Sequence, residues 1–209
     1  MNTPTNKRFA GTKPSSPSTP LTSTNTSFIL SPLASDCGTA QQRLENVLKQ
    51  LLAWNEKWLA AHRRGTSLCT SIEAIKRRAL DQKEKDKNVD LYPIDELKVH
   101  CNNLAVIMTI FEDVISNTKI FKNQLENLVQ TDETKVFFKT WTTDRFLDAT
   151  NAVLEAYEKE FQLKTIVKED IAHGTTKSEL AWHSVVWQYP SFVNSDVEFL
   201  LKSIKMEIS

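Results

Sequence analysis

Apolar side chains recur alternately every three and four residues over a long stretch near the start of this chain. Between residues 41 and 80 they keep a heptad register: Leu44, Val47, Leu51, Trp54, Trp58, Ala61, Leu68, Ile72, Ile75 and Ala79. Such a repeat predicts a long amphipathic helix that packs lengthwise on other helices. The register continues through Gly65, although a glycine costs about 1 kcal/mol in a helix interior. We therefore expect one continuous helix, with two stacked helices as the alternative.

Two further segments have the pattern of long helices. A charged, aperiodic stretch at residues 82–92 predicts a turn, and the segment 94–130 that follows carries two adjacent apolar rows. A face that wide is expected to contact at least two other helices. A third long helix is predicted to begin with a side-chain cap at Thr142 or Thr143. It is predicted to stop at Gly174, with the glycine in a positive φ conformation.

The C-terminal part predicts two short helices. Thr176 and Glu179 resemble a capping box for a helix through Trp187, which ends before Pro190, and a last helix is expected to start at Ser195. No segment shows the alternation of a strand. The predicted class is therefore all-α, an elongated antiparallel bundle of three long helices plus two short C-terminal helices.

The chain divides in composition at about residue 38. Residues 1–38 contain 22 Ser, Thr, Pro or Asn residues and only four charged residues. Such a segment buries too little apolar area to offset the entropy lost on ordering. We therefore expect a disordered Ser/Thr/Pro-rich tail at 1–38 and a coiled-coil-like helical bundle at 39–209.

The tail carries two features with regulatory potential. Its candidate phosphorylation sites each precede a proline, as proline-directed kinases require, and are Thr3, Ser16, Thr19 and Ser31. Phosphate would add about −1.5 to −2 charge at each of them. The apolar stretch 28–33 interrupts the polar tail and is interpreted either as a docking peptide or as a strap on the bundle.

Composition disfavours several classes of function. The 209 residues include 26 basic and 26 acidic side chains, so the net charge is zero. Domains that bind nucleic acid directly usually have an excess of basic residues, which this chain lacks. The longest apolar run, 104–111, is too short to span a membrane, and the N-terminus has no secretory signal. Three cysteines without a CxxC pair suit a reducing compartment. We expect an intracellular protein that binds neither nucleic acid nor membrane.

The residues do not predict an enzyme or a cofactor. Phosphate-binding and dinucleotide-binding loops need glycines, and this chain has four in all. The four histidines lack metal-ligand spacing and are His62, His100, His173 and His183. The acids at 155, 158 and 160 lie among lysines and are interpreted as a solvated face. Arg63-Arg64 and the basic run 76–78 are interpreted as a hydrated helix face, with phosphate contact or nuclear import as the alternative.

Aromatic residues gather at the C-terminal end. Trp182, Trp187, Tyr189 and Phe192 fall within eleven residues, where short helices offer little volume to bury them. They either cap the bundle or form a binding patch, because aromatic side chains anchor protein interfaces.

Several motifs resemble the family of the cyclin-dependent kinase 2-interacting proteins. The most specific is Phe138-Lys139-Thr140-Trp141-Thr142-Thr143, which is similar to a Phe-x-Thr-Trp-x-Thr signature of that family. The similarity continues through residues 154–173 and 187–196. Nearer the start it includes Lys57-Trp58, Gly65, Ile72 and Ile75-Lys76, and in all it covers roughly residues 44–196.

The resemblance implies a non-catalytic nuclear adaptor in DNA replication, cell-cycle and genome-maintenance signalling. The implied protein partners are cyclin-dependent kinase 2 and other S-phase kinases, a checkpoint kinase complex, and an AAA+ ATPase assembly also linked to ribosome biogenesis. On the resemblance alone, the candidate partner contacts are Trp141, Tyr157, Lys164, His173 and Trp187, which join the aromatic candidates Trp182, Tyr189 and Phe192. Core packing is the alternative for Trp141 and Tyr157.

A second hypothesis comes from the heptad pattern. The chain would then be a structural coiled-coil subunit that pairs with a second helical subunit and has no regulatory partner. Exposure of Leu48, Leu52 and Leu59, which lie off the first apolar row, would favour this alternative.

Overall fold

Five helices make up the part of the chain that the computed structural model describes, which is residues 39–88, 92–132 and 135–209. They are α1 (Ala40–Lys85), α2 (Ile94–Asp132), α3 (Thr143–Asp170), α4 (Lys177–Gln188) and α5 (Ser195–Glu207). The predicted all-α class, with three long helices and two short C-terminal ones, is confirmed. The predicted tail, its four phosphorylation sites and the apolar stretch 28–33 lie outside the described residues.

Side-chain caps set where the helices begin. Thr142 accepts a hydrogen bond from the backbone N–H of Arg145 at the start of α3, as predicted. Thr176 and Glu179 form the predicted reciprocal capping box of α4. A second capping box, between Thr39 and Gln42, begins α1.

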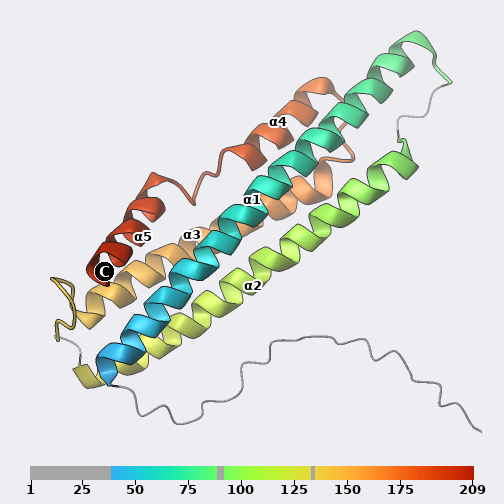
Figure 1. Cartoon of the computed structure of the whole chain (residues 1–209). Helices are drawn as coiled ribbons and strands as arrows, with labels where there is room; N and C mark the ends of the chain where they lie inside the picture. The colour runs from blue at the N-terminus through green and yellow to red at the C-terminus, as the bar shows by residue number, and fades with distance from the viewer. Residues whose placement is uncertain (1–38, 89–91, 133–134) are drawn as a thin grey trace, which may run out of the picture. The chain divides into compact units, whose positions relative to one another are not determined.

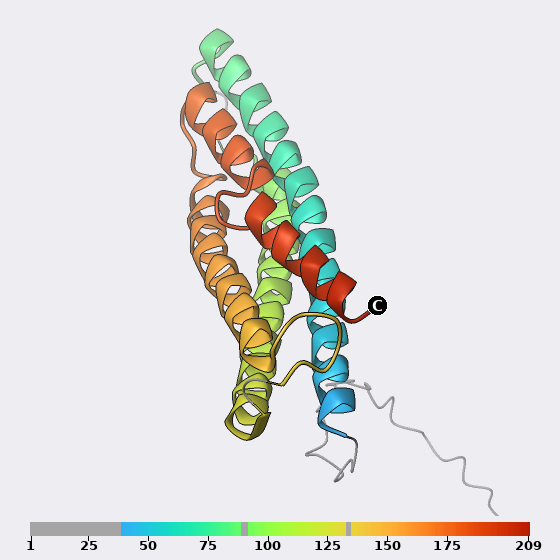
Figure 2. The same ribbon diagram turned by 90° about the vertical axis from the view of Figure 1, so that its left-hand side faces the viewer.

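The helices form a bundle in which α4 and α5 together take the place of a fourth helix (Figures 1 and 2). α2 runs antiparallel to α1 and α3, and it packs against both of them, as its wide apolar face predicted. α4 and α5 follow each other back along α3, and both also contact α1. With 46 residues, α1 is about 69 Å long and contacts α2, α4 and α5.

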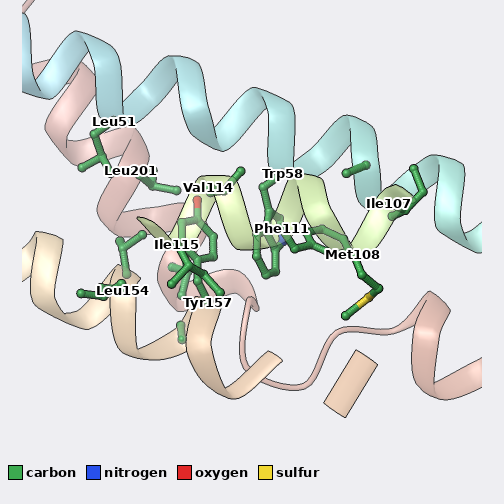
Figure 3. Packing of buried hydrophobic residues seen from close by; sticks show 14 of the residues in the cluster. Leu51, Trp58, Ile107, Met108, Phe111, Val114, Ile115, Leu154, Tyr157 and Leu201 are labelled. Atoms are coloured by element: carbon green, nitrogen blue, oxygen red, sulfur yellow. The ribbon is translucent and has the colours of Figure 1, made fainter. Parts of the chain in front are cut away.

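Aromatic side chains from three helices meet in the middle of the core (Figure 3). The ring of Trp58 in α1 lies 4.3 Å from that of Phe111 in α2 and stacks at 4.4 Å on that of Tyr157 in α3, between ring centroids. All three side chains are buried, whereas Trp54, one turn before Trp58, is only half-buried. The core therefore ties the three long helices together at one level.

The structure settles two predictions about glycines. α1 is continuous through Gly65, as expected. The prediction for Gly174 is wrong, because α3 ends earlier, at Asp170, and the backbone of Gly174 is not left-handed. A Cβ at residue 174 would stand 2.8 Å from Cδ2 of Leu180, so the glycine permits close packing of α4 on the α3–α4 connection.

Candidate functional site

A buried ion pair on α3 is the centre of the contacts that hold α4 and α5. Nζ of Lys164 lies 3.1 Å from Oε1 of Glu160, one helical turn away, and both side chains are fully buried. The interpretation of Glu160 as part of a solvated face is therefore wrong. Its position continues the buried row that includes Val153 and Tyr157, so the acid points into the bundle.

Both charged groups also bond to the backbone where α4 passes into α5. Lys164 donates to the carbonyl oxygen of Trp187 at 3.1 Å, and Glu160 accepts from the backbone N–H of Phe192 at 2.9 Å. These backbone groups flank Pro190, which lies just past the end of α4. Burial lowers the pKa of Lys164, while the Glu160 carboxylate acts in the opposite direction. The pair thus fixes the α4–α5 connection.

Trp187 fastens α4 to α1. Its indole is fully buried, and Nε1 donates to the carbonyl oxygen of His62 at 3.3 Å. Nζ of Lys164 lies 4.7 Å from the centroid of the same ring. The ring occupies the space that a side chain at position 65 would need, so Gly65 is what lets α4 approach α1. Burial, and then the nearby Lys164 charge, lower the pKa of His62 to about 4.

The Phe-x-Thr-Trp-x-Thr motif holds the other end of α5. Lys139 donates to the carbonyl oxygen of Met206 at 2.6 Å. The backbone N–H groups of Thr140 and Trp141 donate to Oε2 of Glu207 at 2.8 and 3.2 Å, and the Thr140 hydroxyl bonds Oε1. Desolvation would raise the pKa of Glu207, but these hydrogen bonds hold it below its ordinary value. The motif therefore clamps the α2–α3 connection onto the C-terminal end of α5.

The predicted partner-binding residues separate into two groups. Tyr157, Lys164 and Trp187 are buried, and the Tyr157 hydroxyl donates to Oδ1 of Asn55 at 2.8 Å, so these side chains pack the bundle. Trp141 is half-buried, its ring 5.2 Å from that of Phe146. Partner contact by these four side chains stays a prediction.

The other group faces solvent. The exposed fractions are 52% for Trp182, 64% for Tyr189 and 41% for Phe192, and His173 is also exposed. Val185 lies between Trp182 and Tyr189 on the outer side of α4, opposite the buried row that contains Trp187. We call Trp182, Val185, Tyr189 and Phe192 the α4 aromatic face. His173 lies apart from this face, with its ring 6.4 Å from that of Tyr92.

A groove adjoins the α4 aromatic face. It lies between α1 and α5, has a volume of about 630 Å³ and shares Tyr189 with that face. Its apolar lining includes Leu52 and Leu59, which are half-buried, whereas Leu48 is fully buried in the core. The exposure that would have favoured a missing helical partner on this side of α1 is therefore not found.

The described residues show no cluster suited to a metal ion. No three His, Cys, Asp or Glu side chains come together closely enough there to hold one. Burial raises the pKa of the Cys69 thiol to about 12, which keeps it protonated at neutral pH. No helix in the described ranges has an apolar stretch long enough to cross a membrane.

Sequence reasoning missed three residues that build this region. They are His62, Glu160 and Glu207, each of which accepts a hydrogen bond from a segment distant in sequence: α4, the α4–α5 connection and the α2–α3 connection, respectively. For Glu160 a signal was present, because it keeps the heptad spacing of its buried neighbours. The fold and the site together define a helical-bundle protein whose exposed aromatic side chains gather on its broken fourth helix.

The chain is homologous to the cyclin-dependent kinase 2-interacting proteins of several species. It is 33% identical to the human protein over 116 residues, which is 54% of each chain. It is 25% identical to the Xenopus laevis protein over 149 residues, 68% of this chain and 72% of that protein. The mouse protein is 25% identical over 143 residues, 65% of this chain and 66% of that protein. The chain thus spans about half the length of the human relative. No protein-family profile matches it.

Proposed function

We propose that this chain is a non-catalytic adaptor that binds a cyclin-dependent kinase assembly in cell-cycle signalling, and that the α4 aromatic face makes the contact. The homologous proteins are named for an interaction with cyclin-dependent kinase 2. The observation that carries the proposal is the exposure of Trp182 and Tyr189 directly opposite the buried side of α4. A surface helix normally carries charged residues there.

The composition around these residues supports the same assignment. From 180 to 194 the chain has no Asp, Glu, Lys or Arg, although a quarter of its residues are charged. Cores of protein interfaces are depleted of charge and enriched in Trp and Tyr. Because the Glu160–Lys164 pair and Trp187 hold α4 on the bundle, its aromatic face is presented in a fixed orientation, which lowers the entropy cost of binding.

The resemblance extends the proposal to particular assemblies. We infer S-phase and checkpoint kinase complexes and AAA+ ATPase subunits as partners, in nuclear processes that include replication, the DNA damage checkpoint and ribosome biogenesis. The alternative function is a structural coiled-coil subunit. It is favoured by a row of exposed apolar residues on α2, including Val99 and Val106.

Binding of the full chain to purified cyclin-dependent kinase 2 with its cyclin tests the proposal. Truncation of interface Trp and Tyr residues commonly costs 2 kcal/mol or more, so Trp182→Ala with Tyr189→Ala should weaken binding at least about 10-fold. Ile166→Ala on α3 is the matched control, because Ile166 is similarly exposed and lies on another helix. Surface plasmon resonance gives the dissociation constants.

The double variant is expected to keep the unfolding temperature of the parent, because both side chains are exposed. Equal affinity of the parent and the double variant would overturn the assignment of the α4 aromatic face. Absence of binding by the parent, alongside recovery of one helical protein at equal stoichiometry from nuclear extract, would favour the structural subunit.

A further inference from the structure

α2 exposes a second apolar surface, on a different side of the bundle. Val99, Val106 and Ile120 are 60%, 58% and 43% exposed and are spaced by seven residues, with Asp113 at the one intervening heptad position. Ile110, one turn after Val106, is half-buried and packs against the core. Seven residues return a helix to nearly the same face, so these side chains form one line along α2. From residue 99 to residue 120 the line extends about 32 Å.

A basic edge of α1 runs alongside this line. Ser71 and Arg78 line a groove together with Val99, and Arg78 donates to Glu96 at the start of α2 at 3.3 Å. Lys57 and Arg64 precede them at the same seven-residue spacing, so they lie on the same edge of α1. α1 and α2 are antiparallel (Figure 1), and the ring of Trp58 next to Lys57 lies 4.3 Å from that of Phe111, so Lys57 and Arg64 lie level with the middle of the α2 line.

The charge on this edge is balanced only in part by acids of the bundle. The edge carries the basic side chains of Lys57, Arg64 and Arg78, and the acidic residues Asp95 and Glu96 at the start of α2 line the same groove as Arg78. Arg78 is paired with Glu96. Lys57 and Arg64 are exposed and form no ion pair with any residue that the structure describes, although Nζ of Lys57 lies 3.4 Å from the centroid of the Trp54 ring. A ligand that suits this surface therefore has an apolar side beside an acidic one.

We propose that the surface formed by Val99, Val106 and Ile120 of α2 with Lys57 and Arg64 of α1 receives an acidic amphipathic helix of a partner protein. A helix of about 20 residues matches the length of the line and uses the helix-in-groove mode of recognition. Its apolar side packs on α2, and its Asp or Glu residues face α1. Charge complementarity of this kind fixes the partner and its register.

This surface is separate from the α4 aromatic face. α1 packs against both α2 and α4, and Figure 1 shows these two helices on either side of it. The chain can therefore hold a helical partner on α1–α2 while the α4 aromatic face is occupied. The inference does not depend on the α4 aromatic face; it uses the α2 row that also favours the structural-subunit alternative, and it adds the basic edge of α1 to define the chemistry of the partner.

Site-specific photo-crosslinking of the full chain in cell extract tests the proposal. The crosslinker is placed at residue 106, and at residue 112 as the control, because Glu112 is exposed elsewhere on α2. Mass spectrometry of the crosslinked peptides identifies the segment captured. We expect residue 106, and not residue 112, to capture an acidic amphipathic helical segment. Lys57→Glu with Arg64→Glu should lower that yield about five-fold, whereas Trp182→Ala should leave it unchanged.

Four results would overturn the proposal. They are equal yields from residues 106 and 112, capture of nucleic acid, capture of a second copy of this chain, and capture of a segment that is not acidic. Val106→Asp is a second variant, which changes the apolar line and leaves the basic edge intact. With the crosslinker placed at residue 99, this variant should lower the yield of the captured helical segment. Circular dichroism of each variant checks that the bundle is folded.

Discussion

The indole of Trp187 lies so close to Gly65 that a Cβ at residue 65 would stand 2.2 Å from Cζ2 of the ring. The glycine lies in the interior of α1, where it costs helix stability. In return, α4 approaches α1 closely enough for Nε1 of Trp187 to donate to the carbonyl oxygen of His62. The contact between Gly65 and Trp187 therefore determines how close the broken fourth helix lies to the bundle.

Gly65→Ala should destabilise the protein by about 2 kcal/mol. Alanine is the better helix former by about 1 kcal/mol, but the added methyl group collides with a fully buried ring, and overpacking of this kind typically costs more. Urea unfolding followed by tryptophan fluorescence measures the change.

Ser67→Ala is the control for Gly65→Ala, since Ser67 is exposed two residues further along α1. Its effect should stay within about 0.5 kcal/mol. In a Trp187→Phe background Gly65→Ala should cost less, because the smaller ring leaves room for the methyl group. An unchanged or higher unfolding midpoint for Gly65→Ala alone would contradict the close contact.

Lys164→Met should destabilise the protein by about 3–5 kcal/mol. The substitution leaves the buried Glu160 carboxylate without its counter-ion, and an uncompensated buried charge is costly. α3 offers a matched control in Lys159→Met. Lys159 also pairs with a glutamate one turn away, Glu155, at 2.6 Å, but that pair is exposed. The control should leave the urea midpoint almost unchanged, and equal effects of the two variants would refute the role given to Glu160.

The helices were predictable because their signals are local. The heptad row of α1 and the caps at Thr142 and Thr176 each depend on residues within one or two turns. The end of α3 was not predictable in this way. Gly174 is needed because it packs closely against Leu180, and its backbone does not adopt a positive φ. In the sequence, a glycine that ends a helix with a positive φ cannot be distinguished from a glycine that permits close packing.

The candidate site was predictable only in part, since both sides of α4 are apolar. Trp187 lies on one side, and Trp182 and Tyr189 lie on the other. Periodicity shows two rows without indicating which one faces the core. Gly65, far away in the sequence, makes room for Trp187 and so decides the question. Glu160 was assigned to solvent because its partners on the α4–α5 connection are likewise distant in sequence.

Acidification should destabilise the protein between about pH 6.5 and pH 4 through His62. Its pKa is lowered from 6.5 to about 4 in the folded protein, so the unfolded chain binds more protons in this range. The contribution of neutral His62 to the free energy of unfolding is therefore fully present above pH 6.5 and is lost as the pH falls toward 4. Between pH 7 and pH 5 the loss should be about 1 kcal/mol, allowing for solvent screening of a half-buried ring. Urea unfolding at both pH values measures it.

His62→Gln should flatten this pH dependence, because glutamine does not titrate. His173→Gln, at an exposed histidine, should leave the dependence as it is in the parent. If His62→Gln loses as much stability as the parent between pH 7 and pH 5, another group is responsible.

Glu207→Ala should release the C-terminal end of α5 from the Phe-x-Thr-Trp-x-Thr motif. The Glu207 carboxylate accepts the backbone N–H groups of Thr140 and Trp141, and alanine leaves both donors without this partner. Hydrogen exchange of these two amides should accelerate about 10-fold, as expected for the loss of a hydrogen bond to a charged group. Glu198→Ala is the control, because Glu198 pairs with Lys202 within α5 at 2.6 Å. It should leave both amides as slow as in the parent, and equal acceleration by the two variants would show that the motif is not held by Glu207.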